Sequence, residues 1–203
     1  MTEVKICGLT DAAMVQVALE AGADFLGFNF VRKSPRFIEI EAVQPLLALC
    51  RAAGVKAVGL WQGDGSLPLE QVIASGIDIL QAHGVHPGPQ PLPTWHAMGV
   101  SEGADLPAEA LPYERLLLDA KPPKDAAYAG GHGASFDWTI LRDWQAPQPW
   151  MLAGGLTPDN VAEAIRISGA VGVDVSSGVE HTKGEKDADL IRAFIAKAKA
   201  ANA

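Results

Sequence analysis

The feature of this sequence that most constrains its fold is a regular alternation of short apolar segments with segments of helical character. The apolar segments span residues 4–8, 25–30, 55–61, 79–84, 96–101, 115–120, 149–155 and 172–178. They are hydrophobic along much of their length, which is typical of parallel strands covered on both faces. Eight strand–helix units close naturally into a ring. The sequence therefore predicts an α/β protein, a single (β/α)8 TIM barrel domain over residues 1–203. The alternative is an open doubly wound sheet, which would have fewer strands.

The expected helices lie between these strands and cover residues 11–22, 41–54, 69–76, 137–144, 158–169 and 187–203. Several of them end in glycine, as helices commonly do. The unit between the fourth and fifth strands is the weakest. Its segment "VHPGPQPLPTW" (85–95) is rich in proline and could form no more than a turn.

Charge and cysteine usage exclude several classes of protein. The formal net charge is -8, which argues against nucleic acid or an anionic membrane surface as the main partner. No apolar run approaches the roughly 18 residues of a membrane span, and the first residues lack the pattern of a signal peptide. Cys7 and Cys50 have neither C-x-x-C nor zinc-type spacing, so free thiols, a cytoplasmic location and no structural metal are expected.

Polar residues at the ends of the apolar segments are the candidates for chemistry, because active sites of such barrels lie at the carboxyl ends of the strands. These residues are Cys7, Asn29, His83, Asp119 and Ser176. Side chains alternate along a strand, so Lys5 shares a face with Cys7 and Asp174 shares one with Ser176. If the first and last strands are neighbours, Lys5 and Asp174 would point inward and neutralise each other.

Cys7 and Asp119 could form a pair of proton-transfer groups. A glycine follows Cys7 at the strand end, where the sulfur could face a pocket and Lys5 could favour the thiolate. Asp119 follows "LLL", and apolar burial would raise its pKa and let it carry a proton near neutrality. The alternatives are a small buried hydrophobic residue for Cys7 and a loop or helix cap for Asp119.

Glycine-bearing segments and one basic loop could bind an anionic ligand. The segments 130–138, 152–160 and 173–180 contain glycines, and the last two follow strands seven and eight, where barrels commonly bind phosphate through backbone amides. Tight turns are the alternative. In the loop "FVRKSPRF", Arg36 follows Pro35 and could bind a carboxylate, although a solvated charge cluster is the usual explanation. Among the histidines, His83 at a strand end is the best site candidate, with interior hydrogen bonding as the alternative.

Seven motifs in this order resemble one family over residues 5 to about 187: "KICGLT", "GFNFVRKSPR", "LQAHG", "LLLDA", "GGHGASFDW", "LAGGLTPDNV" and "GVDVSSGVE". The sequence is similar to the phosphoribosylanthranilate isomerases of tryptophan biosynthesis. The resemblance implies an Amadori rearrangement of N-(5′-phosphoribosyl)anthranilate to 1-(o-carboxyphenylamino)-1-deoxyribulose 5-phosphate, without a metal or organic cofactor. It also implies a small-molecule substrate as the partner and a monomer or homodimer.

The resemblance assigns a role to each matching residue. Cys7 would be the general base and Asp119 the general acid, while Arg36 would hold the anthranilate carboxylate. His83 and Asp174 complete the substrate site. The phosphate end would be lined by Gly154, Gly155, Ser177 and Gly178. The segment "AKPPKDAAYAGGHG" after Asp119 is expected to be a loop of the family's type.

Two rival functions are open at this point. One is a related sugar-phosphate isomerase acting on an imidazole-type ribonucleotide, but such enzymes generally use a pair of carboxylates, whereas this sequence has a single thiol on the first strand. The other is a barrel that binds a phosphorylated ligand without converting it. Retention of both Cys7 and Asp119 argues against that, because binding alone requires neither a base nor an acid.

Overall fold

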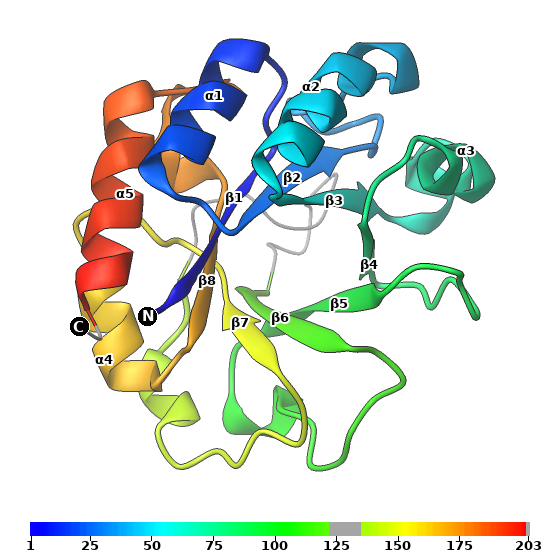
Figure 1. The fold of residues 1–203 in the computed structure, drawn as a ribbon. Helices are drawn as coiled ribbons and strands as arrows, with labels where there is room; N and C mark the ends of the chain where they lie inside the picture. The colour runs from blue at the N-terminus through cyan, green and yellow to red at the C-terminus, as the bar shows by residue number, and fades with distance from the viewer. Residues whose placement is uncertain (122–134, 202–203) are drawn as a thin grey trace.

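The computed structural model describes residues 1–121 and 135–201, and within them the parallel strands close into a barrel (Figure 1). The barrel strands are β1 (Glu3–Cys7), β2 (Phe25–Asn29), β3 (Lys56–Trp61), β4 (Ile79–His83), β5 (Thr94–Val100), β6 (Arg115–Ala120), β7 (Trp150–Leu152) and β8 (Gly172–Val175). Each pairs in parallel with the next, and β8 pairs with β1. The predicted barrel is confirmed.

The register of β1 and β8 decides which side chains face the centre. Lys5 pairs with Asp174 across these strands, and their side chains meet inside the barrel. Below them, apolar side chains from β3 to β7 fill the interior, namely Val58, Ile79, Trp95, Ala97, Leu117 and Met151. The side chains on the outer face of the strands form the larger core, which lies between the strands and the helices. This alternation explains why the predicted strands are apolar along most of their length.

Five α-helices occur in the described residues: α1 (Ala12–Ala21), α2 (Ile40–Ala53), α3 (Leu69–Ala74), α4 (Val161–Ser168) and α5 (Ala188–Ala200). The Asp11 side chain accepts a hydrogen bond from the amide of Met14 and so starts α1. The left-handed Gly22 ends the same helix. None of the described helices is long and apolar enough to cross a membrane.

The helical layer is uneven around the barrel. Figure 1 shows α1, α2, α4 and α5 along the side of β1, β2 and β8, whereas loops surround β5 and β6. The described segments 84–93 and 101–114 contain no α-helix, only the 3₁₀ turn η2 (Gly103–Asp105). The prediction that 85–95 could be only a turn agrees with this.

The prediction of a helix over 137–144 was wrong. The structure has a 3₁₀ turn there, η3 (Trp138–Leu141), started by the Asp137 side chain. Trp138, Thr139 and Ile140 are weak helix formers, and Pro147 prevents a longer helix.

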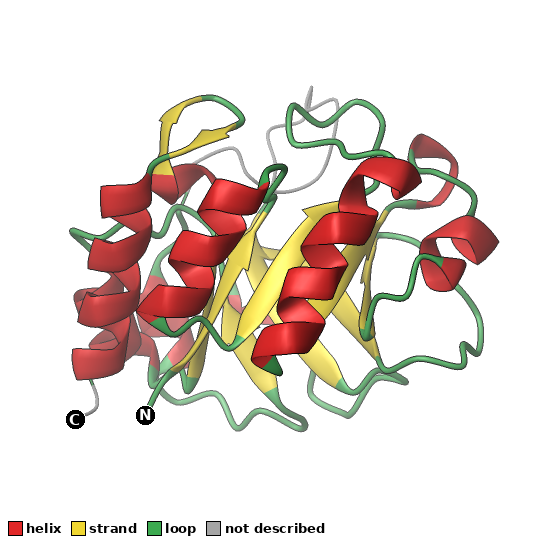
Figure 2. Cartoon of the chain, turned by 45° about the horizontal axis from the view of Figure 1, so that its top comes forward, coloured by secondary structure: helices red, strands yellow, loops and turns green. Residues whose placement is uncertain are grey.

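A small antiparallel hairpin follows β8 and consists of β9 (Glu180–Thr182) and β10 (Glu185–Lys186). The 3₁₀ turn η4 (Ser177–Val179) connects it to the barrel. Figure 2 shows the hairpin at the end of the barrel away from both termini. It therefore lies at the carboxyl ends of the strands, where the candidate residues gather.

Candidate active site

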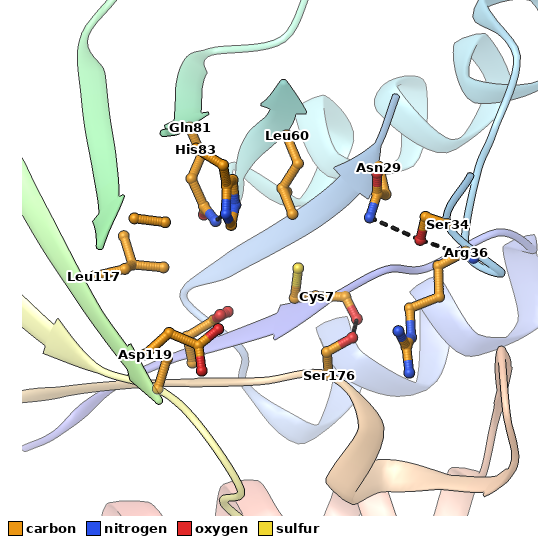
Figure 3. Close-up of a pocket in the computed structure, with 13 residues that line it drawn as sticks. Cys7, Asn29, Ser34, Arg36, Leu60, Gln81, His83, Leu117, Asp119 and Ser176 are labelled. Carbon is orange, nitrogen blue, oxygen red and sulfur yellow. Dashed lines mark hydrogen bonds between the residues drawn. The ribbon is translucent and has the colours of Figure 1, made fainter. Parts of the chain in front are cut away.

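A pocket of about 440 Å³ opens at the carboxyl ends of the strands (Figure 3). Its lining comes from nearly every barrel strand and from the loop after β2. The lining residues are Cys7, Asn29, Ser34, Arg36, Leu60, Gln81, His83, Ala97, Leu117, Asp119, Ala153, Asp174 and Ser176. Five of the predicted site residues line this pocket together: Cys7, Arg36, His83, Asp119 and Asp174. Figure 3 shows the Cys7 sulfur in the middle of the pocket, with Asp119 on one side and Arg36 on the other.

Lys5 and Asp174 form the buried ion pair that the strand pattern predicts. The Lys5 Nζ lies 2.7 Å from Asp174 Oδ1, and the lysine is fully buried. Burial works against the charge on Lys5. Asp174 and then Cys7 outweigh burial, and the net effect raises the pKa of Lys5. An ammonium group is therefore fixed beside the Cys7 sulfur.

Cys7 is a buried free thiol at the end of β1. Burial raises its pKa above the usual value, and although Lys5 and Lys186 act in the opposite direction, they do not cancel burial. Lys5 favours the thiolate, as expected, but burial has the larger effect on the pKa of Cys7. Cys7 is therefore a thiol at neutral pH.

Asp119 is the second-last residue of β6 and is only partly exposed. Burial is the main reason that the pKa of Asp119 rises to about 7, and repulsion from Asp174 adds to it. This confirms the expectation that apolar burial would let Asp119 carry a proton near neutrality. A carboxylic acid and a carboxylate are thus both populated at this position around pH 7.

His83 and Gln81 lie side by side on the inner face of β4. The amide nitrogen of Gln81, Nε2, donates a hydrogen bond to Nε2 of His83 at 2.8 Å. Burial, followed by the charge of Lys5, lowers the pKa of His83 to about 3. The imidazole is therefore neutral at any physiological pH. Sequence reasoning missed Gln81, although strand alternation places it on the same face as His83.

Arg36 is held in a loop whose shape depends on Asn29 and Ser34. The Asn29 amide donates to Ser34 Oγ at 3.0 Å, and the backbone amide of Arg36 donates to the same oxygen at 3.2 Å. The Arg36 side chain is only 3% exposed, and its guanidinium donates two hydrogen bonds to Glu180, from Nε at 2.6 Å and from Nη2 at 2.8 Å. Sequence reasoning missed Glu180, since nothing in the strand pattern marks a residue of this hairpin.

The predicted phosphate-binding residues line a hollow of about 320 Å³ that adjoins the pocket. Asp119, Ala153, Asp174 and Ser176 border both spaces. The four predicted residues in the hollow are Gly154, Gly155, Ser177 and Gly178. Within the described part of the chain, their backbone amides donate no hydrogen bonds to protein acceptors. Such amides are suitable donors for an anion.

Two of these glycines are required by the geometry of the hollow. Gly154 has φ +84°, and a Cβ there would lie 2.5 Å from the amide nitrogen of Ala120. A Cβ on Gly178 would lie 1.8 Å from the carbonyl oxygen of Leu156. The loops after β7 and β8 therefore touch each other directly, and no side chain fits between them.

The start of α4 lies beyond the glycines, and one of the amides that precede the helix already has a partner. The helix begins at Val161, and the side-chain oxygen of Asn160 accepts a hydrogen bond from the Thr157 amide at 2.8 Å. This amide already has a partner, so the amides nearest the glycines are the better anion donors. The third glycine segment, 130–138, and the segment after Asp119 lie largely in residues 122–134, outside the described residues.

The residues around the pocket show no metal-binding arrangement. Among the described residues, no group of three or more His, Cys, Asp or Glu side chains could hold a metal ion. The side chains that line the pocket include groups able to transfer protons and groups able to bind anions. Fold and site together are typical of a (β/α)8-barrel enzyme.

Comparison with known proteins identifies the family. Residues 4–197 match the family model described as N-(5′-phosphoribosyl)anthranilate (PRA) isomerase. The chain belongs to this family and is an isomerase, as the sequence predicts. A relative from Hyphomonas neptunium, an N-(5′-phosphoribosyl)anthranilate isomerase, is 47% identical over 210 residues, covering 98% of both chains. One from Paracoccus denitrificans is 46% identical and covers 97% of both.

Solved structures agree with this assignment. The crystal structure of phosphoribosyl anthranilate isomerase from Thermotoga maritima has a TM-score of 0.84 at 34% identity, covering 98% of this chain and 100% of that one. Another isomerase structure, solved in complex with reduced 1-(o-carboxyphenylamino)-1-deoxyribulose 5-phosphate, has a TM-score of 0.80 at 32% identity and the same coverage.

Proposed function

We propose that this chain isomerises N-(5′-phosphoribosyl)anthranilate to 1-(o-carboxyphenylamino)-1-deoxyribulose 5-phosphate with Cys7 as the general base and Asp119 as the general acid. The observation that carries these roles is one pocket holding both a buried thiol and a carboxyl group with a pKa of about 7. The pocket lies between an arginine and a glycine-lined hollow. A substrate with a carboxylate at one end and a phosphate at the other fits such an arrangement.

Asp119 acts first in this scheme. Opening of the ribose ring requires a proton on the ring oxygen, and the protonated carboxyl group of Asp119 supplies it. A pKa of about 7 matches this task, since a substantial fraction of Asp119 carries a proton at neutral pH. The ring opens to a Schiff base between the sugar C1′ and the anthranilate nitrogen.

Cys7 acts second. The Schiff base makes the C2′ hydrogen acidic, and the Cys7 thiolate removes this proton to give an enolamine, which tautomerises to the ketone. Burial disfavours the thiolate, while Lys5 and Lys186 stabilise it when it forms. The two lysines thus lower the free-energy cost of producing the base at a buried position.

The remaining predicted residues bind and orient the substrate. Arg36 holds the anthranilate carboxylate, and the amides of Gly154, Gly155, Ser177 and Gly178 bind the phosphate. His83 is neutral, so it offers the substrate a hydrogen bond without a charge. Asp174 keeps Lys5 in place beside Cys7. No step in this scheme needs a metal or an organic cofactor.

The direct test is the loss of anthranilate fluorescence when purified protein meets freshly generated phosphoribosylanthranilate. Cys7→Ala is measured alongside, with Cys50→Ala as the matched control at the other buried cysteine. Turnover by the wild type and by the control, but not by Cys7→Ala, supports the activity and the base. Turnover by all three proteins would support the proposed reaction but would show that Cys7 is not its general base. Substrate binding without turnover by the wild type would favour the non-catalytic binder.

We further propose a single-domain protein over residues 1–203 that works in the cytoplasm as a monomer or homodimer. The pairing of β1 with β8 supports a single domain, because the two ends of the barrel sequence meet. The two free thiols agree with a reducing compartment. Light scattering at several protein concentrations separates monomer from homodimer.

A further inference from the structure

The carboxylate of Glu180 is the centre of a buried ionic cluster at the Arg36 end of the pocket. Its Oε1 accepts from Arg36 Nε at 2.6 Å and from Lys186 Nζ at 2.8 Å. Its Oε2 accepts from Arg36 Nη2 at 2.8 Å and from the backbone amide of Gly184 at 3.0 Å. Only 4% of the Glu180 side chain is exposed. Four donors therefore fix this carboxylate, and the carboxylate in turn fixes the plane of the guanidinium.

Two glycines allow Arg36 to lie in this position. A Cβ on Gly8 would approach Arg36 Cδ to 2.6 Å, so the stem of the arginine passes directly over the residue that follows Cys7. Gly184 has φ +90°, and a Cβ there would lie 2.8 Å from the carbonyl oxygen of Pro35. The β9–β10 hairpin thus packs on the loop that carries Arg36, while Gly8, the residue after β1, packs against the arginine side chain.

Lys186 attaches the cluster to the end of β8. Its Nζ donates to the carbonyl oxygen of Ser176 at 2.8 Å, and the hydroxyl of Ser176 donates to the carbonyl oxygen of Cys7 at 3.2 Å. The hairpin is therefore connected by hydrogen bonds to the two strand ends nearest the proposed base. Two cations and one carboxylate give the Arg36, Glu180 and Lys186 cluster a formal charge of +1, which complements an incoming carboxylate.

We propose that Glu180 is a positioning residue that holds the Arg36 guanidinium in the orientation that receives the carboxylate of the substrate. The β9–β10 hairpin would then set the preference of the pocket for an aryl group bearing a carboxylate. This inference rests on the proposed role of Arg36 and deepens it. Glu180 does not touch the substrate in this scheme and acts only through Arg36.

Two explanations of the role of Glu180, its negative charge alone or its positioning of Arg36, predict opposite changes in ligand affinity for Glu180→Gln. If Glu180 acted only as a competing anion, its neutralisation would strengthen binding of a carboxylate. If Glu180 orients Arg36, the amide group of glutamine places N–H donors against the N–H donors of Arg36 and displaces the guanidinium, so binding weakens. The sign of the change therefore separates the two explanations.

The test is calorimetric titration with two ligands. One is reduced 1-(o-carboxyphenylamino)-1-deoxyribulose 5-phosphate, and the other is the same compound without the carboxylate. Glu180→Gln should weaken binding of the first ligand by about tenfold or more, as expected for charge-assisted hydrogen bonds, and change the second by no more than about twofold. Turnover at saturating substrate should fall less than the apparent affinity.

Glu185→Gln is the matched control, since Glu185 lies on the same hairpin with an exposed side chain. It should leave both affinities unchanged. An unchanged or increased affinity of Glu180→Gln for the carboxylated ligand would overturn the proposal, as would an equal loss for both ligands. If Glu180→Gln does not fold, Glu180→Asp takes its place, because the charge is kept and only the reach is shortened. Glu180→Asp should lose less affinity than Glu180→Gln, and only for the carboxylated ligand. If Glu180→Asp binds both ligands as tightly as the wild type does, the proposal is overturned.

Arg36→Met separates this inference from the proposed function. If Arg36→Met weakens only the carboxylated ligand while the Glu180 variants do not, Arg36 keeps its role and the positioning role of Glu180 fails. If Arg36→Met affects neither ligand or both equally, the carboxylate-binding role of Arg36 fails first.

Discussion

Cys7 and Asp119 share one pocket, and burial raises the pKa of both, yet the consequences for catalysis are opposite. For Asp119 the shift to about 7 makes a carboxyl group available as an acid at neutral pH. For Cys7 the shift makes the required thiolate rarer. Lys5 opposes the shift at both groups, and Lys186 opposes it further at Cys7, where the anion is the form that catalysis requires. One physical effect, desolvation, thus favours the form of Asp119 that acts as an acid but disfavours the form of Cys7 that acts as a base, so the base depends on neighbouring cations.

The largest expected effect is at the base. Cys7→Ala should lower kcat by about 10⁴-fold, the upper range for loss of a general base, because no other described side chain of the pocket replaces a thiolate at that position. Anthranilate fluorescence gives the rate, and calorimetric titration with the reduced product analogue should give a wild-type affinity. A residual rate within tenfold of the wild type would show that another group removes the C2′ proton.

The acid should be less costly to lose. Asp119→Asn should lower kcat by roughly a hundredfold, because water can protonate the ring oxygen in place of the carboxyl group. The comparison of the two variants is made at one pH with the same fluorescence assay. A larger loss for Asp119→Asn than for Cys7→Ala would reverse the ranking of acid and base.

The pH dependence of kcat/KM tests the order of the two pKa values. In the active form Cys7 is a thiolate and Asp119 is protonated. In the more abundant form Cys7 is a thiol and Asp119 is a carboxylate. Both forms carry one proton on the pair, so their ratio does not change with pH. The rate should therefore rise with pH through about 7, where Asp119 titrates, and fall again through the raised pKa of Cys7. Outside these limits it should change by about tenfold per pH unit.

Asp119→Asn supplies the control for that assignment. Without the carboxyl group, the rising limb near pH 7 should disappear, and the residual rate should increase with pH until Cys7 is ionised. A rising limb that stays near pH 7 in this variant would mean that a different group titrates there.

The smallest effect is expected at the second cysteine. Cys50 is buried in α2 away from the pocket, and burial raises its pKa to about 11. Cys50→Ala should leave kcat within twofold of the wild type and lower the free energy of unfolding by about 1 kcal/mol, as expected for a small core deletion. Chemical denaturation measures this. A loss of turnover in a folded Cys50→Ala protein would break the distinction between a catalytic and a structural cysteine.

Strand-level features of this protein could be predicted from sequence, and loop-level contacts could not. The Lys5–Asp174 pair follows from side-chain alternation and from the closure of the barrel, both of which are regular. The Arg36–Glu180 contact joins residues from two irregular loops far apart in the chain, and no periodicity connects them. The net pKa shift of Cys7 was also beyond sequence reasoning, because it depends on how much burial outweighs two nearby lysines.

The direct contact of Gly178 with the carbonyl of Leu156 has a consequence for protein engineering. The loops after β7 and β8 are structurally coupled. Neither can gain a side chain or change its path at this point without displacing the other. A loop transplanted from another barrel to alter the anion preference would have to bring its neighbour with it. Natural variation of this end of the pocket should therefore occur in matched pairs of loops.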